Sequence, residues 1–195
     1  ARESAEIFND YRERTFGTDE GYTTVIPTAG NVASGRMSHA EGTETTASGP
    51  NSHAEGAGTT ASGSASHAEG GRFTGSKGST ATAYAAHAEG TSTTASGKAA
   101  HAEGASTIAS GDRAHAEGSR SVSLGYAAHA EGSQCESVGA YSHAGGSGSR
   151  ATGFCSFTHG EWTRATSYYQ TVFGRHNVTN GSTSSLIVGN GFTPE

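Results

Sequence analysis

A four-residue element, His-Ala-Glu-Gly, recurs along most of the 195-residue chain at a fixed spacing. Successive copies begin fourteen residues apart, except that twenty residues separate His67 from His87. The intact copies begin at His39, His53, His67, His87, His101, His115 and His129, and degenerate copies begin at His143, Phe157 and Thr171. A fixed period is the mark of a repeat protein, in which each unit is stable only when stacked on its neighbours.

Each repeat is too short for a pair of helices, which would need roughly twice as many residues. Its second half reads Thr-Thr-Ala-Ser-Gly or a close variant. Strands average about five residues, and glycine supplies the backbone angles of tight turns. We therefore expect two short strands and two turns per repeat, which gives an all-β parallel solenoid with one fourteen-residue coil per repeat.

The interior of such a coil must be thin. Side chains alternate across a strand, so His39 and Glu41 share the outward face while Ala40 points inward. On the second strand Thr45 and Ala47 point inward, and their counterparts in the other repeats are also small. Only 32% of the residues are hydrophobic. Because small side chains bury little apolar area, we expect another surface to cover one face of the roll.

The repeat pattern divides the chain into three parts. We expect residues 33–174 to form the roll, with an insertion at 71–78. We expect residues 1–32 to form a lead-in or cap, and residues 175–195 to form a cap or a transition to a downstream domain. The net charge of −6 argues against nucleic acid as a partner. No apolar run reaches the length of a membrane span, so we expect no membrane insertion. We expect no cofactor, and Cys135 lies in a Thr/Ser column as a small interior residue.

The repeats resemble the YadA-like head repeats of trimeric autotransporter adhesins. The stretches SHAEGTETTASG (residues 38–49) and SVSLG (residues 121–125) carry this resemblance, which covers about residues 33–174. The resemblance implies that each chain folds as a left-handed parallel β-roll and that three chains assemble around a threefold axis. In the family, columns of Val and Ile face that axis. Here those columns hold His and Glu. The HAEG variant, the lead-in EIFNDY and the exit LIVGNG look more like tail-fibre proteins of phages and prophages.

The outward His and Glu columns are the candidate interface of a homotrimer. Equivalent residues of stacked coils lie about 4.8 Å apart, so aligned glutamates need hydrogen-bond donors beside them. Histidines supply such donors, and a neighbouring carboxylate is expected to raise the pKa of each imidazole. This His/Glu ladder comprises His39, Glu41, His53, Glu55, His67, Glu69, His87, Glu89, His101, Glu103, His115, Glu117, His129, Glu131 and His143.

Three other roles for this pattern are weaker. His and Glu can bind metal ions, but a dedicated site occurs once or twice in a chain, whereas this pair recurs seven times. The pattern is not His-Glu-x-x-His, which needs helical spacing, and no single copy stands out as a nucleophile with its base. Outward Thr-x-Ser columns could bind ice, but they stop after a few coils. We therefore expect neither catalysis nor a bound metal.

Receptor contacts are expected in two places, the insertion and the aromatic region near the C-terminus. The candidate residues are Arg72, Phe73, Lys77, Trp162, Tyr168 and Tyr169. Insertions in solenoids often carry binding residues, and aromatic side chains often anchor interfaces. The alternative in each case is structural, since surface loops are tolerated without function and the terminal repeats of solenoids are atypical caps.

These features predict a non-enzymatic, homotrimeric fibre or head segment that attaches to a cell surface. The favoured setting is a phage or prophage tail fibre on the outside of a virion, where the segment recognises the host or serves as a rigid shaft. The alternative is the head of a trimeric adhesin on a bacterial surface, binding host matrix or glycans. A metal- or ice-binding solenoid is a further alternative. The expected partners are two further copies of the chain and a bacterial or host cell-surface receptor, with a glycan as one candidate.

Overall fold

The structure is a computed structural model that describes residues 21–24, 30–72, 77–177 and 185–191. The described residues form short β-strands joined by turns and contain no helix. The strands pair in parallel and return every fourteen residues or so, which confirms the expected all-β parallel solenoid. None of the described residues belongs to a helix able to cross a membrane. The chain divides into two compact units, residues 1–92 and residues 93–195.

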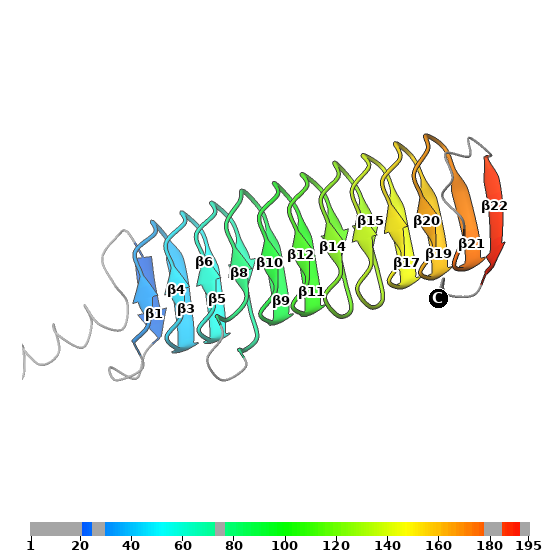
Figure 1. The fold of residues 1–195 in the computed structure, drawn as a ribbon. Coiled ribbons are helices and arrows are strands. Elements are labelled where there is room, and N and C mark those ends of the chain that lie inside the picture. Colours follow the sequence, from blue (N-terminus) through cyan, green and yellow to red (C-terminus); the bar gives the residue numbers. More distant parts are fainter. Residues whose placement is uncertain (1–20, 25–29, 73–76, 178–184, 192–195) are drawn as a thin grey trace, which may run out of the picture. The chain divides into compact units, whose positions relative to one another are not determined.

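In the first unit, each coil contributes one strand to each of two sheets (Figure 1). The first sheet contains β1 (Gly21–Thr24), β3 (Ser38–Thr43), β5 (His53–Ala57), β7 (His67–Ala68) and β9 (His87–Thr91). The second sheet contains β2 (Val32–Ala33), β4 (Thr46–Ala47), β6 (Thr60–Ala61) and β8 (Thr80–Ala81).

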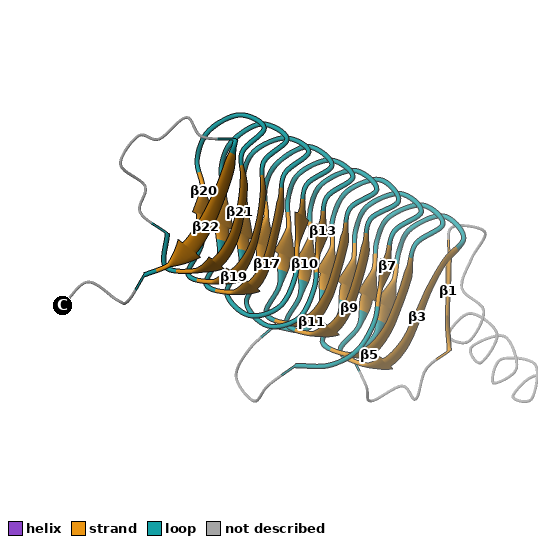
Figure 2. Ribbon diagram, turned by 90° about the vertical axis from the view of Figure 1, so that its right-hand side faces the viewer, coloured by secondary structure: helices purple, strands orange, loops and turns teal. Residues whose placement is uncertain are grey.

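The second unit repeats this arrangement, with turns joining the two sheets of each coil (Figure 2). Its first sheet contains β11 (His101–Ala105), β13 (His115–Ala116), β15 (His129–Ala130), β17 (His143–Ser147), β19 (Phe157–Glu161), β21 (Thr171–Arg175) and β22 (Leu186–Asn190). Its second sheet contains β10 (Thr94–Ala95), β12 (Ile108–Ala109), β14 (Val122–Ser123), β16 (Glu136–Ser137), β18 (Arg150–Ala151) and β20 (Arg164–Ala165).

The register places equivalent residues of successive coils side by side. His39 pairs with His53 and Glu41 pairs with Glu55. The six extra residues of the insertion leave this register unchanged, because His67 still pairs with His87. Strand β1 pairs in parallel with β3, so the first sheet extends into residues 1–32, where we expected a lead-in.

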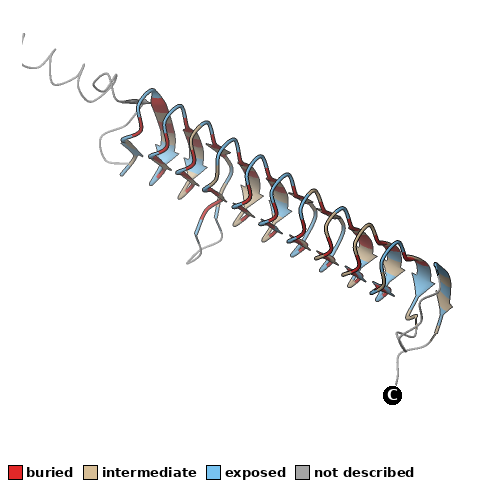
Figure 3. Cartoon of the chain, turned by 90° about the horizontal axis from the view of Figure 1, so that it is seen from above, coloured by how far each residue is buried: buried red, intermediate tan, exposed pale blue. Residues whose placement is uncertain are grey.

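The core between the two sheets is made of small side chains, as the alternation predicted. Figure 3 marks the buried residues in red. Ala40, Thr45 and Ala47 are completely buried, whereas Thr46 and Ser48 are not. The fully buried alanines are Ala40, Ala47, Ala54, Ala61, Ala68, Ala81, Ala88, Ala95, Ala102, Ala109, Ala116, Ala130, Ala144, Ala151 and Ala165. The Cys135 side chain is buried among them, and this burial raises the pKa of its thiol. The interior position expected for Cys135 is confirmed.

Two glycine columns allow the coils to stack closely. The glycine of each HAEG element has a positive φ, for example +104° at Gly56. A Cβ atom on Gly56 would collide with the backbone carbonyl of Gly70 in the next coil. The glycine that ends the second strand is equally confined, because a Cβ on Gly49 would collide with the carbonyl of Gly63. The HAEG column is therefore glycine in every coil, whereas Ala83 and Ser167 take the place of glycine in two coils of the second column.

Candidate functional site

The histidines of the His/Glu ladder form stacks of parallel rings within each unit. In the first unit the ring centroids of His39, His53, His67 and His87 are 4.7–4.9 Å apart, with interplanar angles of 2–7°. In the second unit the rings of His101, His115 and His129 are spaced by 4.7–4.8 Å with angles of 2–3°. The spacing follows directly from the parallel register, which sets equivalent side chains one coil apart.

Glutamates flank these stacked rings. The Nε2 atom of His129 lies 3.2 Å from Glu117 Oε1, and that of His87 lies 3.4 Å from Glu69 Oε1. In both pairs the carboxylate belongs to the preceding repeat. Contacts with the glutamate of the same repeat are longer, such as 3.9 Å from His53 Nε2 to Glu55 Oε2. Hydrogen bonds within one chain therefore supply part of the pairing that aligned carboxylates need.

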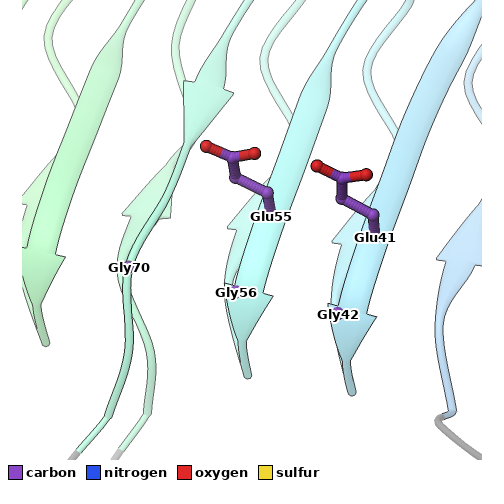
Figure 4. Close-up of a pocket in the computed structure, with 5 residues that line it drawn as sticks. All are labelled: Glu41, Gly42, Glu55, Gly56 and Gly70. Carbon is purple, nitrogen blue, oxygen red and sulfur yellow. The ribbon is translucent and has the colours of Figure 1, made fainter.

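The side chains of the ladder are half-buried, and in the first unit a hollow lies beside two of its glutamates. The His and Glu side chains in these contacts are 23–43% exposed. In the first unit, Glu41 and Glu55 project in the same direction from β3 and β5 (Figure 4). Gly42, Gly56 and Gly70 line the hollow next to these carboxylates. The sequence analysis did not foresee this hollow.

The expected rise in the histidine pKa is wrong for three members of the ladder. Burial lowers the pKa of His67, and the neighbouring His53 and His87 lower it further, outweighing the opposite effect of Glu69 and Glu55. Burial is also the largest cause of the lowered pKa of His39 and of His143. Loss of hydration and repulsion between adjacent rings therefore prevail over attraction to the carboxylates. The neutral imidazole is the favoured form at these positions.

The regular ladder ends at His143. Its ring is turned by 69° relative to that of His129, and Gly145 stands where the earlier repeats carry glutamate. The next coils place Phe157 and Thr171 in the His column, and His159 and Phe173 in the Glu column. Leu186 and Val188 continue these columns on β22. The sequence did not reveal that His159 would approach a ladder glutamate.

The structure places the candidate receptor residues of the insertion in different settings. Arg72 donates a hydrogen bond to Glu44, with its Nη2 atom 2.6 Å from Glu44 Oε2, so its charge is already paired. Lys77 is exposed, and its backbone carbonyl accepts a hydrogen bond from Ser92 Oγ. Phe73 lies outside the described residues. A receptor role for the insertion stays a prediction.

The aromatic candidates near the C-terminus are not brought together. Trp162 lies in the turn between β19 and β20, whereas Tyr168 and Tyr169 lie in the turn between β20 and β21, at the opposite edge of the coil. The Trp162 ring packs over Gly148, where an added Cβ would come within 2.6 Å of it. Tyr168 and Tyr169 instead join other rings along their own edge.

That edge of the second unit carries an aromatic row. It consists of Tyr126, Tyr141, Phe154, Tyr168 and Tyr169, with neighbouring ring centroids 5.4–6.1 Å apart. Arg113 stacks over the first ring, with its Cζ atom 5.2 Å from the centroid. Tyr126 and Tyr141 were not predicted from the sequence, because equivalent residues of successive repeats were aligned only within the strands. Aligning the turns on the same fourteen-residue period would have placed these side chains in adjacent columns.

Comparison with known proteins adds no family assignment. The chain matches no protein-family model, and it matches no curated protein. The site must therefore be interpreted from its own residues.

Proposed function

We propose that the chain is a non-enzymatic segment of a homotrimeric fibre that attaches to a cell surface, as part of a phage or prophage tail fibre outside the virion. One observation is the main support for a trimer. Phe173, Leu186 and Val188 are 44%, 62% and 72% exposed, and they occupy the same two columns as the His/Glu ladder. Apolar side chains gathered on one face mark an interaction surface.

The thin core supports the same proposal. The buried side chains are mainly Ala, Ser and Thr, which remove little apolar surface from water. A second layer of contacts on the ladder face would add to that burial. Three copies of one chain around an axis, each a left-handed roll, would bring three such faces together, with stacked His and Glu along most of the axis and apolar residues at one end.

A mass measurement in solution tests the trimer. We expect three times the chain mass of 19.6 kDa by light scattering after size exclusion. Leu186→Lys combined with Val188→Lys should shift the population toward monomer, because charges would have to be buried at the interface. Ile108→Lys is the matched control, since Ile108 is also exposed but lies on the second sheet. A wild-type protein that runs as a folded monomer would contradict the proposal.

The aromatic row is the candidate contact for a cell-surface glycan. Tyr168 and Tyr169 are highly exposed, and aromatic rings with polar edges suit the apolar faces and hydroxyl groups of sugars. We expect fluorescently labelled protein to bind an array of bacterial cell-wall polysaccharides, and Tyr168→Ser with Tyr169→Ser to weaken binding by about tenfold or more.

Tyr84→Ser is the control for this experiment, because Tyr84 is an exposed tyrosine of the first unit, outside the aromatic row. Equal binding by wild type and the double variant would remove the aromatic row as the receptor contact. That result would not contradict the proposed trimer, because the mass measurement tests the ladder face and not the aromatic row.

A further inference from the structure

The first observation concerns the repeat in which the HAEG pattern changes to His-Ala-Gly-Gly. Gly145 stands at the Glu position of this repeat, and His159 stands at the same position in the next coil. A Cβ atom on Gly145 would lie only 2.8 Å from Glu131 Oε1, and it would also crowd His159 Nδ1. The missing side chain therefore lets the His159 imidazole reach across one coil toward Glu131.

This substitution brings three donor atoms together. Glu131 Oε1 lies 3.2 Å from His143 Nε2 and 3.6 Å from His159 Nδ1, and the three atoms lie within 4.8 Å of one another. A tetrahedral zinc site with bonds of about 2.0–2.1 Å separates its ligand atoms by roughly 3.3 Å. The distance from Glu131 Oε1 to His143 Nε2, 3.2 Å, is slightly shorter than that separation, and the distance to His159 Nδ1, 3.6 Å, is slightly longer. Small side-chain adjustments would let the three donors converge on one ion.

The regular part of the ladder has a different geometry. There the imidazoles are stacked with nearly parallel planes, and their centroids are 4.7–4.9 Å apart within each unit. Two nitrogens bound to one zinc ion can be separated by at most about 4.2 Å. Parallel rings also direct their lone pairs side by side, so they do not converge. At the end of the ladder, the two imidazoles come from different columns, and both lie near Glu131 Oε1.

The chemistry of the three groups suits a transition metal. Two imidazoles and one carboxylate form a known ligand set for zinc, and such a set leaves a position open for water. The Phe157 ring packs against His143 with centroids 4.8 Å apart and provides an apolar wall. The side chains of His143, Glu131 and His159 are 27%, 33% and 49% exposed, so an ion could enter from solvent.

We propose that Glu131, His143 and His159 form a binding site for one divalent transition metal ion per chain, with Zn²⁺ as the best match. The recurrence of the HAEG pair disfavours a metal at the regular ladder, where other groups of two histidines and one glutamate also lie close together. It does not apply here, because among the described residues only His159 brings an imidazole from the Glu column to a ladder carboxylate. The site lies where the polar ladder gives way to apolar residues on the same face. A bound ion would link three successive coils at that transition, because Glu131, His143 and His159 each belong to a different coil.

Titration of the chelator-stripped full chain with Zn²⁺ by calorimetry tests this proposal. We expect one strong site per chain in the wild type, and an affinity at least about 100-fold lower in His159→Ala and in Glu131→Gln, because loss of a direct ligand should exceed the 10–100-fold effect of losing a supporting residue. Replacing Zn²⁺ with Co²⁺ should give the visible absorbance of a four-coordinate ion in the wild type. Thermal melting without metal shows whether each variant is folded.

His115→Gln is the matched control, because His115 is a regular ladder histidine between Glu103 and Glu117. It should bind Zn²⁺ as the wild type does. No strong site in the wild type, several equivalent sites per chain, or the same loss in His115→Gln as in His159→Ala would each overturn the proposal. If Zn²⁺ raises the melting temperature of the wild type but not that of folded His159→Ala, the proposal is supported.

Discussion

Gly56→Ala should destabilise the first unit strongly, although Gly56 is exposed to solvent. Exposed substitutions usually change stability by no more than about 0.5 kcal/mol. Here the new methyl group would meet the backbone carbonyl of Gly70, and alanine would have to adopt a φ of +104°. Backbone strain and overpacking each cost about 1–3 kcal/mol. We expect a loss of about 3 kcal/mol or more.

Thermal melting followed by circular dichroism measures this effect. For a chain of this length, 3 kcal/mol corresponds to a decrease of about 6–12 °C in the melting midpoint. Gly71→Ala is the control, because an added Cβ there meets nothing within 4 Å and its φ is not in the positive range. That variant should melt within about 2 °C of the wild type. Equal melting of the two variants would show that the coils do not stack as closely as described.

The repeat predicted most of the fold because one register constrains every coil. Alternation assigned Ala40, Thr45 and Ala47 to the interior, and all three are buried. The same reasoning predicted the spacing of about 4.8 Å between stacked side chains.

Pairing across coils was less predictable. The sequence sets a histidine two residues before a glutamate, which suggests a pair within one repeat. In the structure the short contact of His129 is with Glu117 of the preceding repeat, because the long side chains lean along the stack. The approach of His159 to Glu131 depends on the missing side chain of Gly145, which no column of residue types reveals by itself.

The lowered histidine pKa values predict that the fold loses stability on mild acidification. The pKa of His39 and of His67 lies below the ordinary value of 6.5, with burial as the largest cause. The unfolded chain therefore binds more protons than the folded chain as the pH drops below about 6.5. The stability contributed by these neutral imidazoles is fully present above that pH. It is lost as the pH falls through the lower, folded-state values.

Stacking of the rings enlarges this loss, because each proton on a stack makes the next protonation less favourable. The groups that act on His67 are His53 and His87, which disfavour its protonation, and Glu69 and Glu55, which favour it. Two protonated imidazoles about 4.7 Å apart repel each other by roughly 1 kcal/mol even at the dielectric constant of water. Each further proton on a stack adds another such pair. Glu69 and Glu55 oppose this effect at His67 but do not outweigh it.

Melting the full chain in EDTA between pH 7.5 and pH 5.0 tests this prediction without interference from bound metal. We expect the midpoint to decrease steadily below about pH 6.5. His67→Gln should show a smaller decrease than the wild type, because it removes one titrating ring from the middle of a stack. Its midpoint at pH 7.5 separates any general destabilisation from the titration. A midpoint that rises on acidification would mean that the carboxylates, and not burial and neighbouring rings, control the histidines of the ladder.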